Sequence, residues 1–334
     1  MVERFNRQLR SVYISGTGSY LPEKLLTNAD FEKLVDTNDE WIVQRTGMRE
    51  RRVAAEDQAT SDLAFEAAKK AIESAGLKPT DIDQIIVATV TPDHAFPSTA
   101  CLVQHKLGCR AIQCFDLSAA CSGFLYGLAV ARTAIAACTM EHVLVIGAEV
   151  LTRFTNYKDR GSCILFGDGA GAAVLSPSHN GCGIIDTHMA ADGEFGNVLI
   201  LPAGGSRIPP SHEALERGEH YMRIDGKSVF KLAVSHIVEL VDESLERCGL
   251  TRDNIDLIIP HQMNARIIES AAKRLEIPME KIYMNLARYG NTSAATIPIA
   301  IDEAIREGRV KPGMLVVLVA FGGGLTWSSA LIRW

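Results

Sequence analysis

The sequence predicts an α/β fold made of two similarly folded halves. Continuous runs rich in β-branched residues alternate along the chain with stretches of helical periodicity. Residues 71–87 also align without gaps to residues 244–260, with seven identical positions. The copies lie about half a chain apart, which favours a duplicated architecture over a solenoid, with a chance match as the alternative. We therefore expect halves at 1–175 and 176–334 that form one compact unit.

The individual elements follow from local patterns. Apolar runs without alternation are typical of strands buried on both faces, and they predict strands at 82–90, 142–150, 255–260 and 314–322. A helix is expected from Ser61 as N-cap to Gly76 at its C-terminal end. The glycine-rich run at 165–175 lacks the dinucleotide-binding spacing, and we predict a turn between strands there.

Composition and charge narrow the function classes. The 334 residues are 47% hydrophobic and 22% charged, which is typical of a globular protein of enzyme size. The net charge of −6 gives no general reason to expect nucleic acid. Without an apolar signal core or bilayer-length run, the chain is expected to be cytosolic and to lack membrane contact. The eight cysteines form no C-x-x-C pair, so we expect free thiols and no metal site.

Cys121 is the first candidate for chemistry. It lies in "DLSAACSGFLYGLAVA" (116–131), at the apparent start of an apolar helix. The positive end of a helix dipole favours a thiolate, and the small neighbours would allow a substrate to approach closely. The alternative is a small residue of the core, and sequence position alone leaves both readings open.

His261 and Asn291 are possible partners for Cys121. His261 follows a predicted buried strand, at a position where sites gather in α/β sheets, whereas Asn291 precedes a helix of small residues. Each has a structural alternative, a core histidine or a helix N-cap. Together the three residues could activate a thiol and hydrogen-bond to an oxyanion. The order Cys, His, Asn also matches papain-like peptidases, but the sequence around the nucleophile differs from theirs.

A run of three glycines, 322–324, follows the last predicted strand. Glycine loses much conformational entropy on folding, so three in a row favour a functional reason over a plain turn. We expect the backbone here to approach a ligand closely.

Together these segments resemble β-ketoacyl-[acyl-carrier-protein] synthase III of the thiolase superfamily. The resemblance covers nearly the whole chain and rests on "DLSAACSGF", "IIPHQMNARII", "YGNTSAATIP", "AFGGGLTW", "NDEWIVQRTGMRERR" and "ATVTPDHAFPSTAC". It implies a five-layered αβαβα fold of two duplicated halves. It also implies an acyltransferase that condenses an acyl-CoA primer, with acetyl-CoA expected, and malonyl-acyl carrier protein. The products would be β-ketoacyl-acyl carrier protein, CO₂ and CoA, with no metal or redox cofactor.

The resemblance assigns roles to the candidate residues. Cys121 would carry the acyl group, and His261 and Asn291 would stabilise the enolate formed by CO₂ loss. The backbone amides of Cys121 and Gly323 would form a second oxyanion hole, and Phe321 would shape a dry pocket.

Coenzyme A is expected at a separate group of residues. Trp41 and Arg45 are four positions apart on one helical face, where an indole and a guanidinium could hold an adenine ring. The resemblance adds Arg160, Gly226 and Asn264 to this site. It also places Phe96 across a homodimer interface, against the partner's acyl pocket. Pocket depth is expected to depend on Phe96, Leu201 and Phe230.

A carrier-protein surface is expected after His261. Arg266, Lys273 and Arg274 share one helical face, to which an acidic carrier protein could dock, although Glu269 dilutes the charge. An ordinary solvated face is the alternative, and the match of Arg266 to the family's docking arginine favours docking.

Other activities remain as alternatives. Related 3-hydroxy-3-methylglutaryl-CoA synthases carry a glutamate base where this chain has Val90, which argues against their chemistry. The open alternatives are a synthase III-like enzyme of secondary metabolism, a Cys-His-Asn hydrolase and a non-catalytic scaffold.

Overall fold

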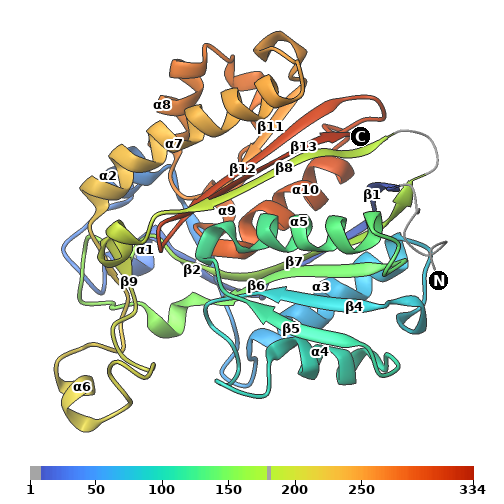
Figure 1. The fold of residues 1–334 in the computed structure, drawn as a ribbon. Helices are drawn as coiled ribbons and strands as arrows, with labels where there is room; N and C mark the ends of the chain where they lie inside the picture. Colours follow the sequence, from blue (N-terminus) through green and yellow to red (C-terminus); the bar gives the residue numbers. More distant parts are fainter. Residues whose placement is uncertain (1–8, 179–181) are drawn as a thin grey trace.

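Two β-sheets organise the residues that this computed structural model describes, 9–178 and 182–334 (Figure 1). The first sheet has the order β1 (Ser11–Tyr20), β7 (Asp168–Ser178), β6 (Val143–Val150), β4 (Gln84–Ala88) and β5 (Gln113–Leu117). The second has the order β11 (Leu257–Pro260), β12 (Leu315–Gly322), β13 (Thr326–Arg333) and β8 (Gly183–Ala191). The pairs β4–β5, β4–β6 and β11–β12 are parallel, and the other pairs are antiparallel.

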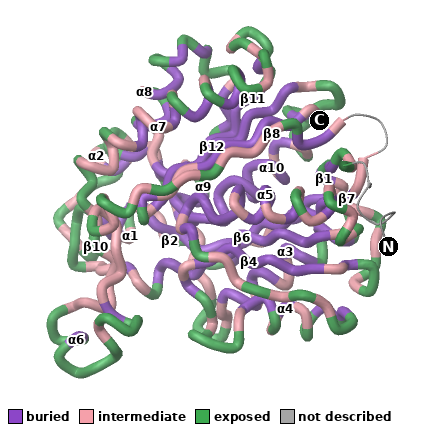
Figure 2. The backbone as a smooth tube through the Cα atoms, viewed as in Figure 1, coloured by how far each residue is buried: buried purple, intermediate pink, exposed green. Residues whose placement is uncertain are grey.

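The helices complete a five-layered αβαβα arrangement, as expected. The outer layer on the first sheet is α3 (Thr60–Ser74) and α4 (Thr99–Leu107). The middle layer is α5 (Gly123–Ala136) and α10 (Thr296–Arg306), packed between the sheets. The outer layer on the second sheet is α7 (Gly226–Arg247) and α8 (Ala265–Leu275). Figure 2 shows buried backbone along both sheets and the middle helices.

Shorter elements join these layers. They are the ribbons β2 (Lys24–Thr27) with β3 (Glu50–Val53) and β9 (Leu199–Ile200) with β10 (Arg223–Ile224), and the helices α1 (Asn28–Phe31), α2 (Asp39–Thr46), α6 (His212–Glu216) and α9 (Leu286–Tyr289). None of the helices in the described ranges combines the length and the apolar character needed to cross a membrane.

The two sequence copies fold alike. In each, a helix ends at a glycine with positive φ, 68° at Gly76 and 65° at Gly249. A short 3₁₀ turn follows, η2 (Pro79–Asp81) or η6 (Arg252–Asn254), and then the buried strand β4 or β11. Because side chains rarely tolerate this backbone conformation, the matched glycines mark the same helix ending twice.

The structure corrects two local predictions. The run 165–175 is not a turn, because β7 begins at Asp168 and continues to Ser178, past the expected boundary at 175. Its glycines and alanines carry little β-propensity, but they allow close packing: a Cβ on Gly171 would lie 2.6 Å from the Ile299 nitrogen of α10. Helix α3 begins at Thr60 rather than after Ser61, whose hydroxyl donates to Asp93 at 2.7 Å.

Candidate active site

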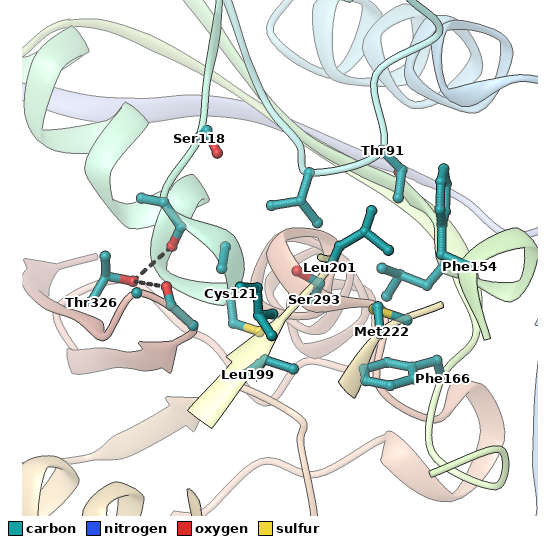
Figure 3. Close-up of a pocket in the computed structure, with 17 residues that line it drawn as sticks. Thr91, Ser118, Cys121, Phe154, Phe166, Leu199, Leu201, Met222, Ser293 and Thr326 are labelled. Atoms are coloured by element: carbon teal, nitrogen blue, oxygen red, sulfur yellow. Dashed lines mark hydrogen bonds between the residues drawn. The ribbon is translucent and has the colours of Figure 1, made fainter. Parts of the chain in front are cut away.

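Cys121 lies in the 3₁₀ turn η3 (Ala120–Ser122), which leads into α5. The turn is pressed against the end of β12, because Gly322 has no side chain: a Cβ there would lie 2.7 Å from the Cys121 nitrogen. The Thr326 hydroxyl also holds the turn by donating to the Ala119 carbonyl at 2.8 Å (Figure 3). The backbone of the glycine run is expected to approach a ligand closely. At Gly322 it instead approaches another part of the same chain, the turn η3.

A cavity of about 360 Å³ opens beside Cys121. Figure 3 shows Cys121 and Ser293 next to each other at its wall. Polar atoms come chiefly from Thr91, Ser118, Ser293, Thr326 and the backbone of Gly323 and Gly324, whereas the apolar lining includes Leu151, Phe154, Phe166, Leu199, Leu201 and Met222. We call this space the inner cavity. Its largely apolar wall can hold an acyl chain next to the sulfur.

A second 3₁₀ turn, η8 (Ser293–Ala295), connects the predicted catalytic residues. The Asn291 side-chain oxygen accepts a hydrogen bond from the Ser293 amide at 2.8 Å. His261 Nδ1 lies 2.7 Å from the Thr296 hydroxyl oxygen. The Ser293 side chain lies next to Cys121 at the wall of the inner cavity (Figure 3). Cys121 and His261 therefore both contact the segment 291–296, to which Asn291 itself belongs.

Burial keeps the thiol and the imidazole uncharged. It raises the pKa of Cys121 to about 12, although the neighbouring Ser293 side chain opposes this shift. Burial also lowers the pKa of His261 to about 3. In a site this deeply buried, desolvation opposes the effect expected of the helix dipole, which would favour the thiolate. The thiol must therefore lose its proton to another group when it reacts.

The Thr296 hydroxyl influences which ring nitrogen of His261 carries the proton. This hydroxyl lies within hydrogen-bonding distance of both His261 Nδ1 and the Ser293 carbonyl, which is 2.9 Å away. A hydroxyl has a single proton to donate. The contact with the Ser293 carbonyl is a donation by Thr296, so Nε2 carries the ring proton and acts as a donor only when Thr296 turns its proton to Nδ1 instead.

Glu149 is a buried carboxyl that the sequence analysis missed. It lies on β6 with no exposed surface and accepts hydrogen bonds from the Thr91 hydroxyl at 2.7 Å and the Thr89 hydroxyl at 3.1 Å. Burial raises its pKa to about 7. The available signal was a lone carboxylate inside the apolar run 142–150, where an unpaired charge is costly.

An outer cavity of about 620 Å³ gathers every residue expected to bind coenzyme A. These residues are Trp41, Arg45, Arg160, Gly226 and Asn264. The Arg160 guanidinium carbon lies 4.2 Å from the centre of the Trp41 ring, closer than that of Arg45 at 5.3 Å. Asn264 caps α8 by accepting a hydrogen bond from the Arg266 amide at 2.9 Å.

Three aromatic residues are expected to shape the pockets of the site: Phe230 and Phe96 the acyl pocket, the latter in the partner, and Phe321 the dry pocket for CO₂ loss. Phe230 lines the outer cavity rather than the inner one, 5.7 Å from the Arg266 guanidinium carbon. Phe321 packs on the α7 side of β12 against His236, because strand alternation gives the Cys121 side to Gly322. Phe96, which is expected to reach the partner's acyl pocket rather than that of its own chain, is 86% exposed and lies outside the inner-cavity wall.

The expected docking cations lie on α8. Arg266, Lys273 and Arg274 are all exposed, as is Glu269, but Arg266 also lines the outer cavity. Among the described residues, no group of three or more His, Cys, Asp or Glu side chains is arranged to hold a metal ion.

Comparisons with known proteins agree with this architecture. Two family profiles match, "3-Oxoacyl-[acyl-carrier-protein (ACP)] synthase III" over residues 115–193 and its "C terminal" counterpart over 245–334. The chain is 57% identical over 321 residues to β-ketoacyl-[acyl-carrier-protein] synthase III of Caldanaerobacter subterraneus subsp. tengcongensis, covering 96% of this chain and 97% of that protein. It is 52% identical to the synthase of the same name from Clostridioides difficile, covering 96% and 98%.

A solved structure shows the same likeness. The crystal structure of 3-oxoacyl-[acyl-carrier-protein] synthase III from Aquifex aeolicus VF5 superposes with a TM-score of 0.90 at 46% identity, covering 97% of this chain and all of that one. The duplicated halves, the buried cysteine and the high identity over nearly the full length lead to one conclusion. The chain belongs to the β-ketoacyl-[acyl-carrier-protein] synthase III family, whose members are acyltransferases with the thiolase fold.

Proposed function

We propose that Cys121 of this condensing acyltransferase takes the acyl group from an acyl-CoA primer and passes it to a carbon nucleophile derived from malonyl-acyl carrier protein. The observation that carries this proposal is the convergence of Cys121 and His261 on segment 291–296, which includes Asn291. The products are β-ketoacyl-acyl carrier protein, CO₂ and CoA, and the reaction initiates fatty-acid synthesis.

In the first half-reaction, Cys121 attacks the thioester carbonyl of the primer. The Sγ–C bond forms, the bond between the carbonyl carbon and the CoA sulfur breaks, and CoA leaves as a thiol. The acyl chain then occupies the inner cavity, whose apolar wall includes Leu201, Phe154 and Met222. Acetyl-CoA is the primer we propose.

In the second half-reaction, the malonyl group loses CO₂ and becomes an enolate. His261 Nε2 and the Asn291 amide group donate hydrogen bonds to the enolate oxygen, because both side chains are uncharged donors held at segment 291–296. The enolate carbon attacks the Cys121 thioester, and the backbone amides of Cys121 and Gly323 stabilise the resulting oxyanion. The sulfur then leaves and regains a proton.

The outer cavity is proposed to hold coenzyme A. The adenine ring would stack at the pair formed by Trp41 and Arg160, with Arg45 beside it. The ribbon β9–β10 lies between the two cavities: Leu199 lines the inner cavity, and its pairing partner Ile224 lines the outer one. The pantetheine arm would pass beside this ribbon to reach Cys121.

Carrier-protein binding and dimer formation complete the proposal. The exposed cations Arg266, Lys273 and Arg274 can contact an acidic carrier protein near the outer cavity. Phe96 is a large apolar side chain with 86% of its surface exposed, so a homodimer interface would bury it. We propose that the protein works in the cytoplasm as such a dimer.

Intact-protein mass spectrometry with a panel of acyl-CoAs tests the function. The expected result is one acyl adduct, absent in Cys121→Ala, that malonyl-acyl carrier protein discharges with release of CO₂. An adduct lost to water without the malonyl donor would indicate a hydrolase. Transfer without CO₂ would indicate another acyltransferase, and the absence of an adduct would overturn the proposal.

A further inference from the structure

Arg51 is a buried cation to which the proposed mechanism gives no task. It lies on β3 with no exposed surface, although arginine is rarely buried in full without an anionic partner. Within the described ranges, no Asp or Glu side chain forms an ion pair with it. Burial lowers the pKa of Arg51 to about 10, so the guanidinium is still charged at neutral pH. A buried charge of this kind requires compensating hydrogen bonds.

Neutral groups supply these hydrogen bonds. The Arg51 guanidinium donates twice to the Ile164 carbonyl, from Nε at 2.9 Å and from one terminal nitrogen. The other terminal nitrogen donates to the Asn28 side-chain oxygen at 2.6 Å. The Phe31 ring lies beside it, with its centre 4.9 Å from the guanidinium carbon. Arg51 therefore joins two segments that lie far apart in the sequence.

Asn28 extends this link to helix α2. Its side-chain nitrogen donates to the Met48 carbonyl at 2.9 Å and to the Asp39 carboxylate at 2.8 Å. Asp39 is the first residue of α2, the helix that supplies Trp41 to the outer cavity. Two hydrogen bonds thus connect the Arg51 guanidinium with this helix.

Ile164 belongs to the segment that supplies the opposite side of the adenine site. Arg160 lies in a turn that local hydrogen bonds close, since the Cys163 amide donates to the Asp159 carbonyl at 2.9 Å. Such bonds shape the turn but do not join it to α2. The Arg160 guanidinium carbon lies 4.2 Å from the centre of the Trp41 ring, so this pair depends on how the turn is held against the helix.

The far end of the same segment is held in another way. The Gly167 amide donates to the Asn291 carbonyl at 3.1 Å, and the Asn291 amide donates to the Leu165 carbonyl at 2.9 Å. These backbone bonds do not involve Arg51, so they should persist without it. The Ile164 carbonyl is the point where the near end, which leads back to the outer cavity, is attached to β3.

We propose that Arg51 is a positioning residue for coenzyme A, because it ties the segment of Arg160 to α2 and so forms the Trp41–Arg160 pair before the substrate binds. Arg51 is fully buried and is not part of the outer-cavity wall, so it acts through this pair. Arginine suits the task, because its rigid plane of N–H donors reaches two acceptors at once. The inference rests on the proposed function, since it concerns the same coenzyme A site.

The expected effect is on affinity rather than on chemistry. A site that is formed in only a fraction of the molecules binds its ligand more weakly in proportion to that fraction. Arg51→Lys keeps the charge, but a single ammonium group does not reproduce the planar contact with both acceptors. We expect the half-saturating concentration of acetyl-CoA to rise by about tenfold, with the maximal rate of Cys121 acylation within about twofold of wild type.

A primer without the nucleotide separates positioning from general damage. Acetyl-pantetheine carries the same thioester but has no adenine ring to stack on Trp41. Timed mass spectrometry of Cys121 acylation is carried out with both primers over a range of concentrations. In Arg51→Lys, the second-order rate constant of acylation should fall by about tenfold with acetyl-CoA and stay within about twofold of wild type with acetyl-pantetheine. Equal losses with both primers would overturn the inference.

A double variant tests whether Arg51 acts through Arg160. Arg160→Ala removes one half of the proposed adenine platform. If Arg51 acts only by placing this side chain, adding Arg51→Lys to Arg160→Ala should not weaken the use of acetyl-CoA any further. A further loss as large as that of Arg51→Lys alone would mean that Arg51 acts by another route, and would contradict the inference.

The link can also be cut at an exposed residue, which keeps the test valid if Arg51→Lys does not fold. Asp39→Ala removes the acceptor of Asn28 and leaves Arg51 in place. We expect it to raise the half-saturating concentration of acetyl-CoA by about threefold, as for the loss of one hydrogen bond. Glu40→Ala is the matched control, because it removes the same charge from the same turn, where Glu40 accepts from Gln44 at 2.9 Å. Equal effects of the two variants would contradict the inference.

The neighbouring arginine of β3 gives the control for Arg51→Lys. Arg52 is half-buried and donates to the Pro22 carbonyl at 3.3 Å, and Arg52→Lys should leave the use of acetyl-CoA unchanged. A loss equal to that of Arg51→Lys would contradict the inference. If wild-type Cys121 is not acylated, or uses both primers equally well, the proposed function or its coenzyme A site fails. If wild type prefers acetyl-CoA and Arg51→Lys matches it, only the role of Arg51 fails.

Discussion

The two halves of the molecule carry the same backbone turn with different side chains. In the first half η3 leads into α5, and in the second half η8 leads into α10. Both turns span three residues, and both begin with a non-glycine residue of positive φ, Ala120 and Ser293. The second residue of the turn is Cys121 in one half and Ala294 in the other.

The difference shows how duplication separates two tasks. The turn of the first half presents a nucleophile to the inner cavity, whereas the turn of the second half presents Ser293 and supports Asn291 and, through Thr296, His261. The middle layer brings both turns together, because Gly147 and Gly322 let the backbones of η8 and η3 approach the two sheets. The same backbone turn, present as η3 and as η8, therefore places Cys121 in one half and the groups that surround it in the other.

Exchanging the nucleophile between the two turns should give the largest effect. Cys121→Ala is expected to lower acyl transfer by at least about 10³-fold, because the covalent intermediate is lost. Adding Ala294→Cys should not restore activity, because Ala294 is 1% exposed and is not part of the inner-cavity wall. Condensation assays with both variants check this, and recovery by Ala294→Cys would mean that the turns are interchangeable.

Changes in the second half should separate the two half-reactions. His261→Ala and Asn291→Ala are each expected to slow condensation by about 10²- to 10³-fold while leaving Cys121 acylation within a few fold of wild type. The reason is that each of these two residues donates to the enolate, which forms only in the second half-reaction. Single-turnover measurements of acylation and of CO₂ release check the split. An equal loss in both steps would show that these residues support the whole site.

Blocking the approach of η8 to β6 should destabilise the fold. Gly147→Ala places a Cβ 2.3 Å from the Ala294 carbonyl oxygen, and such overpacking commonly lowers the free energy of unfolding by about 1–3 kcal/mol. Gly193→Ala is the control, because a Cβ there meets no atom within 4 Å. Thermal unfolding of both variants measures the effect, and equal midpoints would rule out the packing argument.

The smallest expected effects are on the pH dependence of stability. Glu149 in the first half and His261 in the second should change stability in opposite directions as pH rises. Glu149 has its pKa raised from 4.5 to about 7, so the folded state binds more protons and stability falls as pH rises through this range. His261 has its pKa lowered from 6.5 to about 3, so the unfolded state binds more protons and stability falls as pH drops. Each group contributes a slope of up to about 1.4 kcal/mol per pH unit.

Between about pH 4.5 and 6.5 these two slopes oppose each other. Removing one group should therefore leave only the dependence of stability on pH that the other group contributes. As pH rises through this range, the stability of Glu149→Gln should increase more steeply than that of wild type. The stability of His261→Gln should decrease relative to wild type over the same range. Urea unfolding at three pH values in this range checks the signs. Parallel curves for the two variants would mean that neither burial shift governs stability.

Much of the architecture was predictable because its signals are local. The repeated helix, glycine and strand pattern at residues 71–87 and 244–260 anticipated the duplicated halves. The alanines and glycines of β7 were harder to assign, because small residues favour a strand only where another element packs closely against them. The face on which Phe321 lies was also hard to assign, since one step along β12 turns a side chain to the other face of the sheet.

The sequence by itself determined the family, the candidate residues Cys121, His261 and Asn291, and the repeated unit of helix, glycine and buried strand. These follow from residue identity and spacing, which are properties of neighbouring positions along the chain. Only the tertiary structure decided the burial that shifts the pKa values of Cys121, His261 and Glu149, and the packing of η8 directly on β6. The physical reason is that desolvation and hydrogen bonding depend on groups far apart in sequence, which meet only when the two halves pack around the middle layer.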